Sequence, residues 1–208
     1  MKSMQNLTRI LACLLLLVLV NAVNAQDAEA LRKQLYAKYS EVPNYKVNVT
    51  YEAVNDRMGF KNVQEGVLVV SGNRYILKYG SNETWLNDGN TEYVGTKEED
   101  HSQILMFCPG VNPEAVINYG QLLTFYGSGF SSSMAGNKLK LVPNGEAPYK
   151  EVHITASGNN IQSITALDNF GTAHTFNLSG FNTNTSGTQF TINKGEYYEK
   201  INEKSGCK

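Results

Sequence analysis

The feature that most constrains this chain is a strict two-residue alternation of apolar and polar side chains. Between Tyr45 and Ala53 every second residue is apolar, and the residues between them are polar. Because successive side chains of a strand point to opposite faces, this pattern predicts a half-buried strand with one apolar face. With 41% hydrophobic and 18% charged residues, the chain is also neither a disordered tail, a coiled coil nor collagen.

Short strands joined by tight turns follow this first strand. Gly72-Asn73 separates strands expected at 66–71 and 74–79, and Asp88-Gly89 separates strands expected at 83–87 and 90–96. Both dipeptides are typical of two-residue hairpin loops. Further strands are expected at 101–106, 138–142, 149–156, 161–168 and 174–181, with a last short one at 190–192.

Helical spacing appears in two places. In residues 27–39, Ala30, Leu31, Leu35 and Tyr39 recur at intervals suited to a helix, and Pro43 follows its end. After the break at 108–113, Asn112-Pro113 reads as a helix start. It leads into one amphipathic helix or a pair of short helices, with apolar residues Ala115, Val116, Leu122, Leu123, Phe125 and Tyr126. The serines at 128 and 131–133 are interpreted as a flexible loop.

This order of elements predicts an α+β fold with one continuous antiparallel sheet. Successive strands joined by hairpins lie side by side, and the helices can pack on one face. We therefore expect a single curved sheet that forms an unclosed half β-barrel with a helical lid.

The amino terminus has the pattern of a secretory signal peptide. Lys2 and Arg9 precede the apolar run Ile10–Val20, and Val23-Asn24-Ala25 gives a small-x-small cleavage site. The run is too short to span a bilayer. We expect cleavage after Ala25, which leaves residues 26–208 as one exported domain that does not span a membrane. Cys108 and Cys207 then remain, and they either form a disulfide bridge or are two unrelated thiols.

The net charge and the absence of motifs disfavour nucleic-acid binding, metal binding and nucleophilic catalysis. A net charge of −1 provides no basic surplus for binding nucleic acid. His101, His153 and His174 lack metal-ligand spacing, and Ser128 follows a helix instead of forming a nucleophile elbow. We expect no enzyme activity, no catalytic residue, no metal and no cofactor.

Several segments, in their order and spacing, resemble a known family. These are the opening helix with Tyr45-Lys46-Val47, the hairpins 66–75 and 86–93, the segment from Asn112-Pro113 to 122–126, and Phe190-Thr191-Ile192. Together they resemble the LolA-type periplasmic carriers of outer-membrane lipoproteins, in their divergent branch.

The resemblance implies a monomeric periplasmic chaperone that hides lipoprotein acyl chains in an apolar cavity. Such a protein receives its cargo from an inner-membrane release complex and delivers it to an outer-membrane acceptor. Family members carry a lid-latching arginine at a place that Gly72 occupies here. Arg74, on the same face, is either the substitute latch or an unpaired surface arginine.

Alternation supplies the expected cavity lining, although 66–71 could present Val67 and Val69 instead. The expected lining residues are Val47, Val49, Tyr51, Leu68, Val70, Tyr75, Leu77, Tyr79, Trp85, Tyr93, Leu122, Leu123 and Phe125. Pattern alone leaves open whether this face encloses a cavity or is a filled core. The alternatives to a carrier are a periplasmic lipid-binding or envelope-stress sensor on the same half-barrel, a hydrolase, and an exported structural protein.

Overall fold

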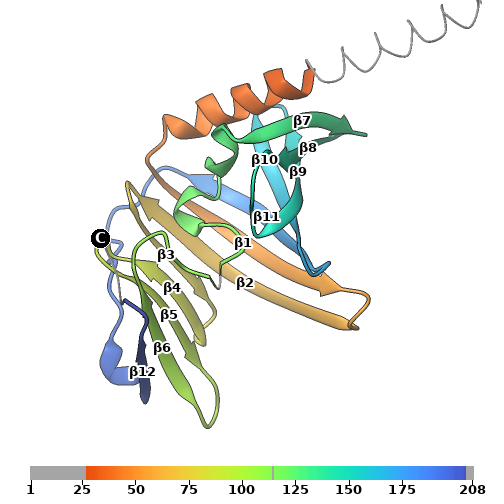
Figure 1. Ribbon diagram of the computed structural model, residues 1–208. Helices are drawn as coiled ribbons and strands as arrows, with labels where there is room; N and C mark the ends of the chain where they lie inside the picture. The colour runs from red at the N-terminus through yellow and green to blue at the C-terminus, as the bar shows by residue number, and fades with distance from the viewer. Residues whose placement is uncertain (1–26, 114, 205–208) are drawn as a thin grey trace, which may run out of the picture.

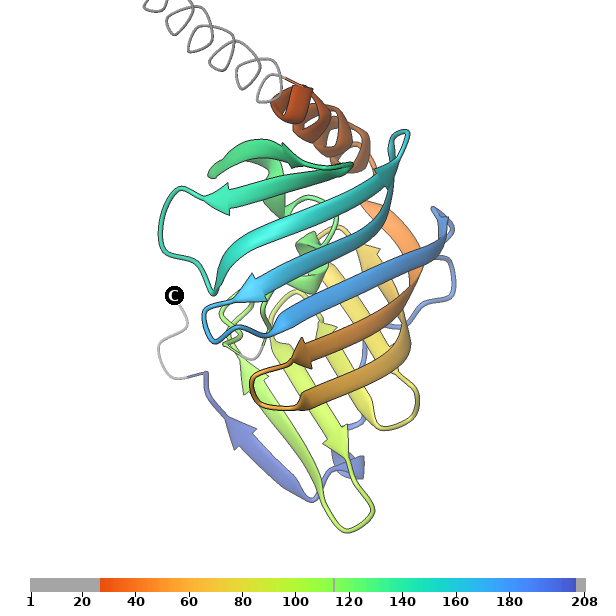
Figure 2. The same cartoon turned by 90° about the vertical axis from the view of Figure 1, so that its right-hand side faces the viewer.

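The computed structural model describes residues 27–113 and 115–204, which form one curved sheet with a helix at its side (Figures 1 and 2). The sheet has twelve strands in the order β12-β6-β5-β4-β3-β2-β1-β11-β10-β9-β8-β7. Because β12 and β7 are the two ends of this order, the sheet is a half-barrel that is not closed. The expected α+β fold with an unclosed half-barrel is confirmed.

The strands, in chain order, are β1 Asn44–Asn55, β2 Phe60–Ser71, β3 Arg74–Tyr79, β4 Glu83–Asn87, β5 Glu92–Lys97, β6 Ser102–Phe107, β7 Phe130–Ala135, β8 Lys138–Pro143, β9 Tyr149–Ser157, β10 Asn160–Asp168, β11 Ala173–Asn182 and β12 Glu199–Asn202. The expected hairpin at Gly72-Asn73 forms, since Ser71 pairs with Arg74. The two-residue loop expected at Asp88-Gly89 is wrong, because Asn87 pairs with Glu92 and the loop is residues 88–91. β1 and β2 are longer than the sequence pattern indicated.

The amino-terminal helix covers residues 27–40 of the described chain. Its buried stripe consists of Ala28, Arg32, Leu35 and Tyr39, whereas Ala30, expected on that stripe, is exposed. The signal peptide expected at 1–25 lies outside the described residues. Within residues 27–113 and 115–204, no helix is long and apolar enough to cross a membrane.

The register of the sheet produces one apolar row across its concave face. Val47 pairs with Leu68, Leu68 with Leu77, Leu77 with Trp85, and Trp85 with Val94. Side chains that lie opposite each other on neighbouring strands share a face and pack together. This row forms the floor of the main core and decides the open question about β2, since Leu68 and Val70 are concave-facing while Val67 and Val69 are not.

A second apolar row lies on the convex face. Val69, Ile76, Leu86 and Tyr93 pair in sequence across β2 to β5. The carboxy-terminal residues 183–204, which we call the strap, cover this row with Phe190, Ile192 and Tyr197 (Figure 1). The strap ends in β12, which pairs with β6 in parallel, so the expected all-antiparallel sheet is wrong at this edge. The strand expected at 190–192 does not form, because these residues pack on the sheet face instead.

Residues 108–129, which we call the plug, cover the concave face between β6 and β7; residue 114 is not described (Figure 1). The expected lid helix is only two 3-10 helices here, η1 Tyr119–Gln121 and η2 Phe125–Gly127. Gly120 and Gly127 weaken any longer helix, which explains this difference. The serines 131–133, interpreted as a flexible loop, instead lie in β7 and alternate between faces. A third 3-10 helix, η3 Lys194–Glu196, lies in the strap.

Cys108 at the start of the plug takes part in a disulfide bond. Cys207, the partner that the sequence suggests, lies outside the described residues. The described chain ends near Cys108, because Asn202 pairs with Met106 and the Glu203 amide donates to the Met106 carbonyl at 2.8 Å.

Docking of the strap depends on the missing side chain of Gly95. A Cβ at this position would collide with the ring of Tyr197. We expect Gly95→Val to lower the free energy of unfolding by about 1–3 kcal/mol, because overpacking forces the strap away from the sheet. Urea unfolding measures this, and Gly145→Ala, which has open space around it, is the control with a change below about 0.5 kcal/mol. Equal stability of both variants would contradict the expectation.

Candidate functional site

The candidate site is the apolar concave face beneath the plug. All of the expected lining residues except Tyr93 lie in or against this one cluster. Tyr93 is corrected to the convex face, because it pairs with Leu86, and Val94 takes the expected place opposite Trp85. The reason is the pairing itself: Leu86 follows Trp85, and successive side chains of a strand point to opposite faces, so the partner of Leu86 lies on the convex face.

The plug fills this concave face with its own side chains. Leu122 and Leu123 are 0% and 1% exposed, and Tyr119 is 5% exposed. The ring of Tyr119 stands edge-on to three sheet aromatics, with centroids 5.1 Å from Trp85, 6.0 Å from Tyr75 and 6.0 Å from Phe176. Such edge-to-face pairs add to the energy of burial. The concave face is therefore packed in this structure, and the plug occupies the space in which the sequence resemblance implies a ligand.

A buried carboxylate fastens the start of the plug to the sheet. Glu92 on β5 is 1% exposed. It accepts hydrogen bonds from the Tyr75 hydroxyl at 2.7 Å, the Asn112 side-chain amide at 2.9 Å and the Gly110 backbone amide at 3.1 Å. Three donors make the burial of an acidic group tolerable. Burial is the main cause that raises the pKa of Tyr75, so its hydroxyl remains a donor to Glu92.

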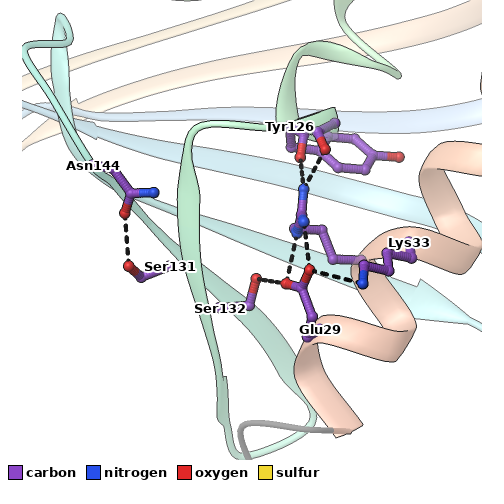
Figure 3. A network of polar contacts seen from close by, with 8 residues as sticks. Glu29, Lys33, Tyr126, Ser131, Ser132 and Asn144 are labelled. Carbon is purple, nitrogen blue, oxygen red and sulfur yellow. Dashed lines mark hydrogen bonds and ion pairs between the residues drawn. The ribbon is translucent and has the colours of Figure 1, made fainter.

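An arginine from the amino-terminal helix fastens the end of the plug (Figure 3). Arg32 donates to the backbone carbonyls of Tyr126 at 2.8 Å and Gly127 at 2.5 Å. Its other nitrogens bind Glu29 at 2.9 and 2.6 Å, and Glu29 also accepts from Ser132 of β7 at 3.0 Å. One charged network thus joins the helix, the plug and β7.

Arg74 lies away from the plug, so it is not the lid-latching arginine that the resemblance implied. Arg74 begins β3 on the convex side, where its guanidinium lies 4.8 Å from the centre of the Phe190 ring. It therefore holds the strap, and the contact with the lid is made by Arg32. Lys194 over Tyr93 and Lys97 over Tyr197 form two further cation–π contacts between strap and sheet.

A hydrogen-bonded chain of Asp168, His174 and Tyr51 lies at the far end of the concave face. The Tyr51 hydroxyl oxygen is 2.8 Å from His174 Nδ1, and His174 Nε2 is 3.2 Å from Asp168 Oδ2. Burial raises the pKa of Tyr51 to about 12. A phenol held neutral in this way is a poor nucleophile, so this chain does not favour the hydrolase interpretation.

The two anchor residues, Glu92 and Arg32, belong to no sequence motif, but their positions in the apolar periodicity mark both of them as unusual. Glu92 lies two residues before Val94 on the same face of β5. It is therefore an acidic residue at a position where the alternation predicts an apolar one. Arg32 lies four residues after Ala28 and three before Leu35, in the buried stripe of the helix. A charged residue at a buried position needs partners, and for Glu92 and Arg32 these include groups of the plug.

Comparisons with known proteins give likenesses of structure only. No family model and no curated protein matches the sequence. A LolA superfamily protein from Nitrosomonas europaea superposes with a TM-score of 0.41 at 11% identity, over 81% of this chain and 98% of that one. A domain described as an outer membrane lipoprotein-sorting protein from Vibrio parahaemolyticus gives a TM-score of 0.33 at 8% identity, over 78% and 95%. At such scores these likenesses carry no argument for function, although their descriptions name the kind of protein that the sequence resembles.

Loss of the Arg32 anchor should loosen the end of the plug. We expect Arg32→Met to lower the free energy of unfolding by about 1–3 kcal/mol, because it leaves the Tyr126 and Gly127 carbonyls without a donor. Backbone amides of the plug should also exchange hydrogen faster, while those of β1 stay protected. Lys33→Met, an exposed neighbour 3.6 Å from Glu29, is the matched control and should change stability by less than about 0.5 kcal/mol.

The same network should make stability depend on pH in the acid range. The hydrogen bond from Arg32 is the main cause that lowers the pKa of Glu29 from 4.5 to about 2. A lowered carboxyl pKa stabilises the fold above pH 4.5, and this contribution is lost as the pH falls toward 2. Urea unfolding at pH 5, 4 and 3 should therefore show a smaller decline for Glu29→Gln than for the unchanged protein. Parallel declines would contradict the expectation.

Proposed function

We propose that this chain binds the acyl chains of lipoproteins on its concave face and carries them through the periplasm to the outer membrane. The observation that carries the proposal is the construction of the plug. Its described residues hold two 3-10 helices and no strand, and they lie across the sheet without being paired to it. The plug can therefore leave the concave face without breaking any ladder of the sheet.

Energetics support an exchange between plug and ligand. Displacing Tyr119, Leu122 and Leu123 exposes apolar surface that an acyl chain can cover again. Each buried CH₂ group of an acyl chain contributes about 0.8 kcal/mol. Replacing one apolar filling by another costs little overall, so a tightly packed empty state is compatible with reversible uptake.

The two anchors give the plug fixed ends about which it can move. Glu92 binds its start at Gly110 and Asn112, and Arg32 binds its end at Tyr126 and Gly127. Both anchors use hydrogen bonds of charged groups, which hold only at short range and in defined geometry. Motion of the segment between the anchors would open the concave face while the ends stay attached.

Binding and transfer test the two parts of this proposal. Native mass spectrometry of the protein incubated with a triacylated lipopeptide should show a one-to-one complex, and binding should raise the unfolding temperature. Absence of both effects would refute acyl binding. The loaded protein should then pass the lipopeptide to outer-membrane vesicles, whereas binding without transfer would favour the sensor interpretation over a carrier.

The ring of Tyr119 should compete with the ligand for the concave face. We expect Tyr119→Val to bind a fluorescent fatty-acid analogue about tenfold more tightly, because less of the plug must be displaced. Its free energy of unfolding should fall by about 3 kcal/mol through the cavity created. Tyr93→Val is the matched control, since Tyr93 is equally buried, at 5% exposed, on the convex face. It should lose similar stability with no gain in affinity, and an equal gain in both variants would contradict the proposal.

A further inference from the structure

Two neighbouring hairpins end in exposed apolar side chains. The β1–β2 hairpin and the β10–β11 hairpin project side by side from one end of the sheet (Figures 1 and 2). Met58 is 76% exposed, Phe60 48% and Phe170 83%, and we call these three residues the apolar tips. Single exposed apolar residues are ordinary on a protein surface, but three gathered at one end of a sheet indicate a surface for interaction.

A buried asparagine holds the two hairpin ends together. Asn55, the last residue of β1, is 1% exposed. Its side-chain oxygen accepts from the Met58 amide at 3.2 Å. Its side-chain nitrogen donates to the Thr172 hydroxyl at 3.1 Å and to the Phe170 carbonyl at 3.5 Å. On the other hairpin, Asp168 Oδ1 accepts from the Phe170 amide at 2.8 Å. The tips are therefore exposed on turns that hydrogen bonds hold in place.

The tips border the concave face. Phe60 pairs with Asn55 at the end of the β1–β2 ladder. It is in the same alternation along β2 as Leu68, which belongs to the concave core. Between them, Asn62 and Gln64 are half-buried, as residues on that face should be. A surface bound to the tips therefore lies next to the concave face.

Cations enclose the apolar residues of the first hairpin. Its end reads Asp56-Arg57-Met58-Gly59-Phe60-Lys61, with one acid and two bases. Lys61 pairs with Glu52 at 2.7 Å, whereas Arg57 is exposed and has no ion-pair partner among the described residues. A phospholipid bilayer provides partners for both kinds of side chain, since its hydrocarbon takes up apolar groups and its phosphates attract an arginine.

The projecting shape also favours a bilayer over a protein partner. A protein would need a matching pocket for each projecting side chain, because binding energy at protein interfaces comes from well-packed, desolvated pockets. A bilayer admits projecting apolar groups without such a match.

We propose that the apolar tips dock this protein onto a phospholipid bilayer, with Met58, Phe60 and Phe170 inserted at the interface and Arg57 on lipid phosphate. The inference deepens the proposed function and rests on it for its purpose, since docking here sets the concave face beside a membrane that receives the cargo. Docking itself is measured on the unloaded protein, so the two proposals can fail separately.

Flotation with vesicles of phosphatidylethanolamine and phosphatidylglycerol tests the insertion. The unchanged protein should float with these vesicles. Met58→Ser/Phe60→Ser/Phe170→Ser should bind them at least about tenfold more weakly, because three apolar groups are lost from the interface. Among single variants, Phe170→Ser should weaken binding about threefold. Tyr198→Ser is its matched control, since Tyr198 is 92% exposed on the strap, and it should bind as the unchanged protein does.

The charge of the vesicles tests the contact of Arg57. Arg57→Gln should bind the anionic vesicles about fivefold more weakly, the effect of one cation near an anionic membrane surface. Its binding to vesicles of phosphatidylcholine alone should stay unchanged. Lys33→Gln removes the same charge from the amino-terminal helix, at the other end of the molecule from the tips, and should leave both affinities unchanged (Figure 1).

Further measurements separate docking from folding and from acyl binding. The triple variant should keep the unfolding temperature and the lipopeptide affinity of the unchanged protein, and should pass the lipopeptide to vesicles more slowly. If the half-exposed Phe60 proves to support the fold, Phe170→Ser decides the test, because its side chain is almost fully exposed.

Each remaining outcome has a distinct meaning. No flotation of the unchanged protein, or equal flotation of the triple variant, would overturn bilayer docking while acyl binding stands. A concentration-dependent dimer that the triple variant loses, without flotation, would assign the tips to a second copy and overturn the proposal. Flotation without lipopeptide binding would refute the proposed function and support docking alone.

Discussion

The structure depends on one constraint: an open half-barrel has an apolar concave face and no second sheet to cover it. The row from Val47 through Leu68 and Leu77 to Trp85 must be removed from water for the sheet to be stable. The plug meets this requirement with an irregular segment in place of a regular layer. The apolar side chains of the plug occupy space that the apolar groups of a ligand could also fill, and the proposed ligand binding depends on this exchange.

The two faces of the sheet are covered in different ways. On the convex face, the strap is part of the sheet through β12 and is held by Arg74, Lys97 and Lys194 over aromatic rings. On the concave face, the described plug has no ladder bonds and is fixed at its ends by Glu92 and Arg32. Release of the strap would expose a sheet edge as well as apolar surface, which favours aggregation. Release of the plug leaves the sheet intact, so the concave face is the one suited to exchange.

Polar groups inside the concave core differ in how well they are satisfied. Glu92 is satisfied by three donors, whereas the Tyr45 and Tyr126 hydroxyls have no partner among the described residues.

The sequence by itself determined most of the strands and the half-barrel, because period-two alternation and hairpin turns are local signals, but it did not predict β7 or β12. It also placed most of the concave lining correctly, and missed Tyr93 by one residue of phase. Only the tertiary structure decided that β12 pairs in parallel with β6, that Arg32 and not Arg74 contacts the lid, and that the plug fills the concave face. These outcomes depend on contacts between residues far apart in the chain, and periodicity along one segment carries no information about what covers it.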